Sequence, residues 1–403
     1  MIKYYQKKLG VKLLEPIQYN NPKPKVKKTI PILILIIAIG FCAFAFYNNS
    51  YFFNIRRLFT GKTAANAKVI FSLKYNPEEK PEFIPYEDSA LYITKNSIKS
   101  LNFNNTVNWE IKYNFTKPII KAYGKYIFIA DGKKIFLYKA NTKLWEKLLD
   151  FEATNAKLNK NGNILVFRQD GINDQIAGFN AQGSKIFKRT YSKNGYLINA
   201  DISTDNKKIV VLSASTQKSS ITSKVEIFEV KSTLSVNSVP VCGIIKEDLL
   251  ATDIKIFGID NIILVADNRI LSLDSKGKER WVKDFSGQKV YKANISSGKY
   301  IVLEQNGTIK SSLLENKSRE IQVLNGEGVI EGEGIKITSP VANIDVFENY
   351  FLINDSNSLY SISKGKLIWS CYLDKDIKYT KAFYEKAQVL LVSRDTAEVI
   401  QVN

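Results

Sequence analysis

The hydrophobic pattern begins with one uninterrupted apolar run near the N-terminus. Ile30–Tyr47 reads IPILILIIAIGFCAFAFY, which is 18 residues without a charge. As a helix rising about 1.5 Å per residue, this run spans about 27 Å, close to the thickness of a hydrocarbon core of about 30 Å. Pro31 falls in the first turn, where a missing N–H is no loss, and aromatic residues follow at the expected interface. The pattern predicts one membrane-spanning helix.

Beyond a polar linker, the pattern changes to short apolar runs that alternate with polar residues and are separated by turn signals. No amphipathic helix is predicted there. The repeating unit is clearest in three stretches: Gly124–Leu149, Asp260–Phe285 and Glu348–Leu373. Each stretch has three strand patterns, and the last carries a tryptophan: Trp145, Trp281 or Trp369. A further strand precedes each stretch, at 118–123, 251–258 and 342–347.

Turn chemistry indicates how these strands are connected. Asp131-Gly132, Asp267-Asn268 and the 355–357 segment each separate two apolar runs. Such residues tolerate positive φ, so they mark tight hairpins between antiparallel strands. The unit is therefore a four-stranded antiparallel meander.

The spacing of the tryptophans gives the length of the unit. Trp145 and Trp281 are 136 residues apart, and Trp281 and Trp369 are 88 apart. These intervals correspond to three and two units of about 45 residues, the length of a propeller blade. Weaker copies occupy the gaps, at 162–190, 207–241 and 298–324.

We therefore predict an all-β fold, a β-propeller of four-stranded antiparallel blades preceded by one N-terminal transmembrane helix. Lys68–Asn403 has 336 residues, which gives 42 per blade for eight blades and 48 for seven. Eight blades fit better, with seven as the alternative. The last repeat ends after three strands, so Lys68–Leu73 is expected to supply its fourth strand and close the ring.

The segments Leu273–Trp281 (LDSKGKERW) and Ser363–Trp369 (SKGKLIW) resemble the repeat of PQQ-like propellers, a relative of WD-repeat propellers. With its predicted anchor, the chain resembles an uncharacterised family, a domain of unknown function, of membrane-anchored propellers from low-GC Gram-positive bacteria. The resemblance implies a fold and a location, and it implies that the repeated tryptophans pack between blades. Quinone-dependent dehydrogenases of this class commonly carry a vicinal cysteine pair, which this chain lacks. Its non-enzymatic scaffolds of envelope assembly are the better analogy.

Composition argues against most catalytic chemistry. The chain has no histidine, which removes the usual general base and the commonest metal ligand. Its three cysteines, Cys42, Cys242 and Cys371, show no CxxC spacing, and we expect the last two to be small buried side chains. Asn354–Asn357 lacks the glycine-hinged loop of a calcium site and is expected to be a turn. We predict no catalytic residue, cofactor or metal.

Charge is distributed unevenly along the chain. Of the formal net charge of +19, residues 1–28 contribute eight Lys and one Glu. The remaining +12 is spread over many turns without an Arg cluster, which favours a solvated basic surface over a nucleic-acid groove. Near the apolar run, five Lys precede it and three basic residues follow it, so the N-terminus is expected in the cytoplasm.

The predicted organisation is a basic cytoplasmic tail at 1–28, a transmembrane helix with an interfacial segment at 29–55, a linker at 56–67 and an extracellular propeller at 68–403. Two alternatives concern processing. Ala43-Phe44-Ala45 has the form of a signal-peptidase site, but the long basic lead and the continuing apolar run favour an uncleaved anchor. A lipobox ending at Cys42 is disfavoured because Phe41 occupies a position that normally needs a small residue.

One segment departs from the repeat. Leu324–Pro340 (LNGEGVIEGEGIKITSP) is interpreted as an unusually long link between two blades, in which glycines interleave three glutamates. Two interpretations remain open, a tolerated surface hairpin and a loop that contacts a partner. The candidate contact residues are Glu327, Glu331 and Glu333.

Two functions follow from these observations. The first is a binding or scaffold module at the cell envelope, held in the lipid bilayer by Ile30–Tyr47, with an envelope protein or an anionic wall polymer as partner and no nucleic acid. The second is a propeller enzyme that acts on cell-wall carbohydrate, or a quinoprotein-like redox enzyme. Acidic side chains converging at the central channel would favour the second function.

Overall fold

The computed structural model describes residues 67–402, except 193–194, 217–220, 231–238, 286–287, 296–299, 307–318, 338, 348–349, 356, 374–375, 384–385 and 387. The predicted tail and apolar run, and all of the linker but its last residue, lie outside the described residues. No helix among the described residues is long and apolar enough to cross a membrane.

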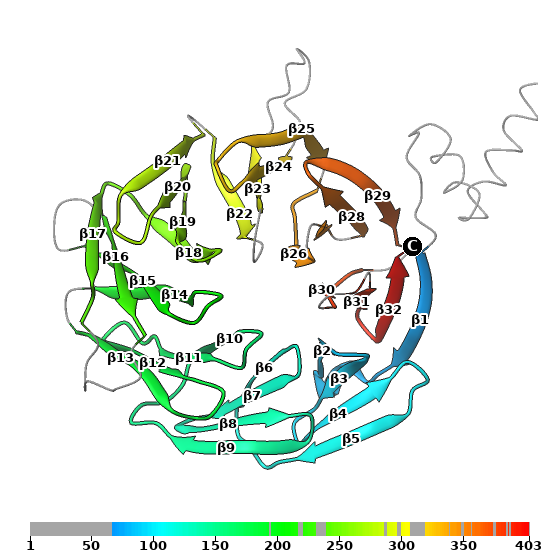
Figure 1. Ribbon diagram of the computed structural model, residues 1–403. Coiled ribbons are helices and arrows are strands. Elements are labelled where there is room, and N and C mark those ends of the chain that lie inside the picture. The colour runs from blue at the N-terminus through cyan, green and yellow to red at the C-terminus, as the bar shows by residue number, and fades with distance from the viewer. Residues whose placement is uncertain are drawn as a thin grey trace, which may run out of the picture. The chain divides into compact units, whose positions relative to one another are not determined.

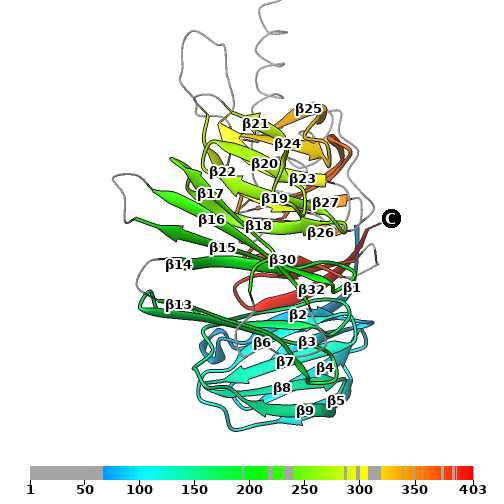
Figure 2. The same ribbon diagram turned by 60° about the vertical axis from the view of Figure 1, so that its left-hand side comes forward.

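The described strands form eight sheets of four antiparallel strands, arranged as a ring (Figures 1 and 2). From the innermost strand outward, the first four blades are blade 1 (β2 Glu82–Tyr86, β3 Ser89–Ile93, β4 Ser97–Asn102, β5 Val107–Lys112), blade 2 (β6 Ile119–Tyr123, β7 Tyr126–Asp131, β8 Lys134–Lys139, β9 Thr142–Leu148), blade 3 (β10 Asn155–Leu158, β11 Ile164–Arg168, β12 Asn173–Phe179, β13 Lys185–Ser192) and blade 4 (β14 Tyr196–Ile202, β15 Lys208–Ser215, β16 Thr222–Glu229, β17 Cys242–Glu247).

The other four are blade 5 (β18 Ala251–Phe257, β19 Asn261–Ala266, β20 Arg269–Leu273, β21 Glu279–Asp284), blade 6 (β22 Val290–Ile295, β23 Tyr300–Asn306, β24 Arg319–Asn325, β25 Ile330–Ile337), blade 7 (β26 Asn343–Phe347, β27 Tyr350–Asn354, β28 Ser358–Ser363, β29 Lys366–Tyr372) and blade 8 (β30 Tyr379–Ala382, β31 Gln388–Val392, β32 Thr396–Val402, β1 Ala67–Lys74). The prediction of an all-β propeller with eight four-stranded blades is confirmed. A short 3-10 turn, Pro77–Glu79, follows β1.

The core lies between neighbouring blades, which explains why the middle strands are apolar on both faces. In β7, three consecutive residues are fully buried. Ile127 and Ile129 pack with blade 1, whereas Phe128 points to the opposite face and packs with blade 3. Successive side chains of a strand alternate between faces, so a sheet covered on both faces reads as a continuous apolar run.

The ring is closed by strands from the two ends of the described chain. β1 pairs with β32 from Ala67 opposite Val402 to Lys74 opposite Thr396. Phe71 is 2% exposed and packs in the core between blades 8 and 1, with its ring 6.1 Å from that of Phe103. The predicted closure by Lys68–Leu73 is therefore confirmed, and it removes the open sheet edge.

Two tryptophans on outer strands join their blades to a turn of the next blade. Trp145 Nε1 donates a hydrogen bond to the carbonyl of Ala181 at 2.9 Å, and Trp281 Nε1 donates to that of Gly326 at 3.0 Å. Each of these turns also places a positive-φ glycine, Gly183 or Gly328, against the indole ring. A side chain at either glycine would collide with the ring. The interpretation of these two tryptophans as blade-packing residues is confirmed.

The free cysteines differ from the prediction of buried side chains. Both Cys242 and Cys371 lie on outer strands and are half-buried. In blade 4, Cys242 stands where other blades use tryptophan, and its Sγ donates to the carbonyl of Lys276 in the next blade at 3.2 Å. The prediction was wrong because an outer strand has only one neighbouring strand to cover it.

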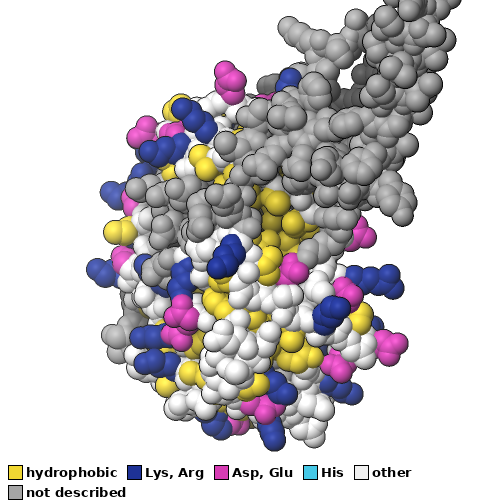
Figure 3. All heavy atoms as spheres, turned by 90° about the vertical axis from the view of Figure 1, so that its right-hand side faces the viewer, with side chains coloured by type: hydrophobic (Ala, Val, Ile, Leu, Met, Phe, Trp, Pro, Cys, Tyr) yellow, Lys and Arg dark blue, Asp and Glu magenta, His cyan; other side chains and the backbone are white. Residues whose placement is uncertain are grey.

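Figure 3 shows how charged side chains are distributed on one face of the molecule. On the face shown in Figure 3, Lys and Arg side chains alternate with Asp and Glu, with apolar side chains between them. A mixed surface of this kind is typical of a solvated exterior rather than of a phosphate-binding groove.

Candidate functional site

The innermost strands carry one polar row in seven of the eight blades. The row, called the inner polar row below, consists of Lys121, Lys157, Asp201, Lys255, Asn294, Asp345 and Lys381, one residue from each of blades 2 to 8. Residues flanking each position pack in the blade cores, as Ala200 and Ile254 do. Alternation along a strand therefore turns the polar residue to the opposite side, toward the inner edge of the next blade.

From blade 4 onward, these side chains bind the next inner strand. Asp201 Oδ2 accepts a hydrogen bond from the Ile256 N–H at 3.0 Å, and Lys255 Nζ donates to the Ile295 carbonyl at 2.7 Å. The same relation continues around the ring. Asn294 Nδ2 donates to the Ile344 carbonyl at 2.8 Å, and Asp345 Oδ2 accepts a hydrogen bond from the Ala382 N–H. Lys381 Nζ donates to the Phe83 carbonyl at 3.4 Å and to Glu82 Oε1 at 3.1 Å. Hydrogen bonds from the described inner polar row thus join five consecutive pairs of neighbouring blades.

A second polar side chain, two residues before the member of the inner polar row on the same strand, adds further hydrogen bonds between blades. Asn199 Nδ2 donates to Asp253, and Asn343 Nδ2 donates to the Thr380 carbonyl at 3.0 Å. Lys292 Nζ donates to the carbonyls of Val341 and of the next residue, both at 2.6 Å. Polar side chains of the innermost strands thus form hydrogen bonds with backbone groups that have no partner in a neighbouring strand.

Burial perturbs the charged members of the row. It raises the pKa of Asp201 and of Asp345, and it lowers the pKa of Lys255, because removal from water disfavours each charged form. Neighbouring charges act on Lys255: Asp253 of the same strand and Asp201 and Asp345 of other blades raise its pKa, and Lys157 of blade 3 lowers it. Side chains from blades 3, 4, 5 and 7 are therefore close enough to interact across the centre of the ring.

The charged side chains at this centre include carboxylates, and Asp201, Asp253 and Asp345 all act on Lys255. Among the described residues, no group of three His, Cys, Asp or Glu side chains is placed to hold a metal ion. The two row carboxylates lie three blades apart, and each is engaged with backbone N–H groups. The row was missed from the sequence, although its signal is visible as polar residues alternating within apolar strands, as in Asn199-Ala-Asp201 and Asn343-Ile-Asp345.

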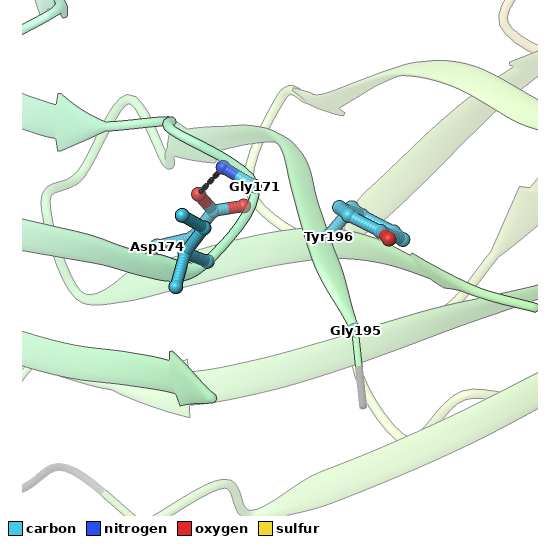
Figure 4. A pocket seen from close by; sticks show the side chains of 5 residues that line it. Gly171, Asp174, Gly195 and Tyr196 are labelled. Carbon is cyan, nitrogen blue, oxygen red and sulfur yellow. Dashed lines mark hydrogen bonds between the residues drawn. The ribbon is translucent and has the colours of Figure 1, made fainter. Parts of the chain in front are cut away.

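A small pocket lies between the β11–β12 hairpin of blade 3 and the start of β14 in blade 4 (Figure 4). Its volume is about 30 Å³, and it is lined by Gly171, Ile172, Asp174, Gly195 and Tyr196. Asp174 Oδ1 accepts from Gly171 N–H and Asp170 N–H, both at 2.9 Å, and its Oδ2 accepts from Leu197 N–H at 2.8 Å. Both carboxylate oxygens are satisfied by backbone groups, so Asp174 joins the blades and is not free to bind a ligand.

The segment predicted to be a long link between blades has a different structure. Residues 324–325 end β24, Gly326–Val329 form a hairpin turn, and β25 is the outer strand of blade 6. The true link to blade 7 covers only residues 338–342. Glu327 lies in the turn and is exposed, as is Glu333 in β25, whereas Glu331 is half-buried and accepts from Asn325 Nδ2 at 3.4 Å.

Among the glycines that suggested a loop, Gly332 is required by the next blade and Gly334 by a side chain of its own blade. A Cβ on Gly332 would lie 2.5 Å from the Gly365 carbonyl oxygen, in the β28–β29 turn of blade 7. The Glu320 side chain occupies the space above Gly334. Close approach of a neighbouring backbone is a standard reason for glycine in a strand. The three glutamates therefore belong to an ordered hairpin, and their contact with a partner stays a prediction.

Solved structures of similar fold are propellers of low sequence identity. BamB from Moraxella catarrhalis superposes with a TM-score of 0.51 at 11% identity, covering 83% of this chain and 99% of that one. Chaetomium thermophilum Sqt1, bound to the N-terminus of the ribosomal protein L10, gives a TM-score of 0.51 at 10% identity, covering 83% and 96%. At such identities these likenesses show the fold alone.

Sequence comparison gives a narrower result. No curated protein matches the chain. A family described as being of unknown function, DUF5711, matches residues 60–402, which is nearly all of the predicted linker and propeller. The chain therefore belongs to the DUF5711 family.

Proposed function

We propose that the chain is a membrane-anchored scaffold whose propeller binds a protein partner outside the cell. The observation that carries this proposal is the completeness of the ring. Every described strand from Ala67 to Val402 belongs to one of eight four-stranded blades. The apolar run of Ile30–Tyr47 lies outside the described residues, and its length and lack of charge support a separate single anchor. A closed ring whose blades are joined by hydrogen bonds gives a rigid surface, and a rigid surface binds a partner at low entropic cost.

The neighbouring folds support a binding role. In the Sqt1 structure, a propeller of similar fold holds the N-terminus of another protein. The carboxylates of the inner polar row are occupied by backbone N–H groups, which favours a structural role for them over a catalytic one. An enzyme acting on wall carbohydrate would need two free carboxylates flanking the bond to be cleaved.

The location of the propeller is tested by thiol labelling. A variant with Lys62→Cys, made in a chain in which the three native cysteines are replaced by Ser, is expected to react with a membrane-impermeant maleimide in intact cells. The basic bias before Ile30 supports a location of residue 62 outside the cell. A second variant with Lys12→Cys is the matched control and should react only after lysis. The reverse pattern of labelling would place the propeller in the cytoplasm and contradict the proposal.

The partner contact is tested at the blade 6 hairpin. Replacing Glu327, Glu331 and Glu333 together with Gln is expected to reduce capture of a partner crosslinked in intact cells several-fold, while the melting temperature changes little. Two of these side chains are exposed, and loss of exposed charges has small effects on stability. Replacing Glu110, Glu146 and Glu279 on other outer strands is the control for net charge. Unchanged capture with a lowered melting temperature would show that the hairpin only braces blades.

A further inference from the structure

Lys255 and Asn294 of the inner polar row meet side chain to side chain between blades 5 and 6. Lys255 Nζ lies 3.4 Å from Asn294 Oδ1, and it also donates to the Ile295 carbonyl at 2.7 Å. Asn294 Nδ2 donates in the other direction, to the Ile344 carbonyl of blade 7 at 2.8 Å. The carboxamide is therefore held with its oxygen toward the amine of blade 5 and its nitrogen toward blade 7.

The surroundings of this contact favour an uncharged amine. Phe257, two residues further along the same face of β18, and Ile295 both belong to the buried core between blades 5 and 6. Burial lowers the pKa of Lys255. A larger fraction of its side chain is then the free amine, which is the nucleophilic form of lysine.

A carboxyl group lies beside the same amine. Asp201 Oδ2 accepts a hydrogen bond from the N–H of Ile256, the residue after Lys255, at 3.0 Å. Among the charged groups that act on Lys255, Asp201 has the largest effect. Burial raises the pKa of Asp201, which brings its carboxyl closer to the pH range in which it can take up and return a proton.

We propose that Lys255 and Asn294 form an intramolecular isopeptide bond that joins blades 5 and 6 covalently. The bond between Lys255 Nζ and Asn294 Cγ forms, and the bond between Cγ and Nδ2 breaks. One proton passes from Nζ to Nδ2 by way of Asp201, and the nitrogen leaves as ammonia. Fixed proximity within one folded chain replaces an encounter between two molecules, and the step needs no oxidant or co-reactant. The bond would be independent of the proposed partner and of the location of the propeller.

Blade 8 supplies an internal control. Lys381 occupies the same row, but its Nζ lies 3.1 Å from Glu82 Oε1, so the amine meets a carboxylate instead of an amide. Glu82 is exposed, and an ionised carboxylate resists attack by an amine. We therefore expect Lys381 to keep a free side chain in the same molecules in which Lys255 is bonded.

The test is mass spectrometry of the full-length protein purified in a mild detergent. The intact mass is expected to be lower than the mass of the sequence by one ammonia. Trypsin should fail to cleave after Lys255, and a branched peptide should join residues 247–269 to residues 293–299. Cleavage after Lys381 should proceed normally.

Two variants remove one reacting group each. Lys255→Arg keeps a cation that can donate to the Ile295 carbonyl but has no amine, and Asn294→Ala has no amide carbon. Both should keep the full mass and lack the branched peptide, with circular dichroism confirming that they fold. Asp201→Asn should form the bond at least about tenfold more slowly, since general acid–base assistance is lost. An unchanged rate in that variant would overturn the route of the proton through Asp201.

An intact mass equal to that of the sequence would overturn the proposal. Loss of ammonia without the branched peptide would overturn it as well, because a succinimide at an Asn-Gly pair such as Asn161-Gly162 has the same mass. The Lys255→Arg variant separates these two origins independently, since it would still lose ammonia from a succinimide but not from an isopeptide bond.

Discussion

Removing β1 should destabilise the propeller more than any other change of comparable length. Deleting Lys68–Leu73 exposes the outer edge of β32 and empties the core position of Phe71, so blade 8 loses both its fourth strand and its packing on blade 1. Loss of the Phe71 side chain alone is expected to cost about 3–5 kcal/mol. We therefore expect the deletion to lower the melting temperature strongly or to abolish cooperative unfolding, measured by circular dichroism.

Three comparisons make this result specific. Deleting Met1–Lys28, a longer segment outside the ring, should leave the melting temperature nearly unchanged. Phe71→Ala should account for much of the loss, whereas Val69→Ala, at a side chain that is 51% exposed, should cost less than about 1 kcal/mol. Equal melting temperatures for chains that begin at Lys68 and at Asn76 would contradict a closing role for β1.

The fold could be predicted because each repeat carries the same local sequence signals. Trp145, Trp281 and Trp369 recur at nearly whole multiples of one blade, and positive-φ turns such as Gly132 separate strands that are apolar on both faces. Closure followed from counting strands at the two ends. These features depend on residues close together in sequence, or on a period that repeats them.

Blade 6 shows where the prediction failed. β25 contains Gly332 and Gly334 and only a weak alternation, so its sequence resembles a loop. The reason lies in another blade, because the β28–β29 turn at Gly365 needs the space that a side chain on Gly332 would fill. A contact between residues 33 positions apart leaves no periodic signal in one sequence.

The inner polar row was hidden for a related reason. Asp201 and Lys255 each look like an ordinary solvated residue within a strand, and their meaning depends on ring closure, which brings blades 3 to 7 to a common centre. Side-chain bonds to the next backbone, such as Lys255 to Ile295, appear only in three dimensions. Sequence reasoning could place the strands but not identify which of their polar residues converge.

Substitution at Gly365 should be far more damaging than at a glycine in a similar turn. Gly365 has a φ of 70°, and a Cβ there would lie 1.6 Å from the carbonyl oxygen of Glu331 in the neighbouring blade. Gly132 has a φ of 58° in the β7–β8 turn, with nothing within 4 Å of an added Cβ. Gly132→Ala should therefore lower the free energy of unfolding only by the cost of a left-handed backbone conformation for alanine, about 1–2 kcal/mol.

Gly365→Ala should add the cost of separating two blade backbones, about 1–3 kcal/mol more, because neither carbonyl nor strand can turn aside as a flexible side chain would. Urea unfolding of both variants beside the wild type measures the two losses. If the losses were equal, the backbone contact between blades 6 and 7 would contribute nothing, and the glycines of β25 would need another explanation. A larger loss for Gly365→Ala would instead show that the glycine-rich sequence of β25 is a requirement of blade packing.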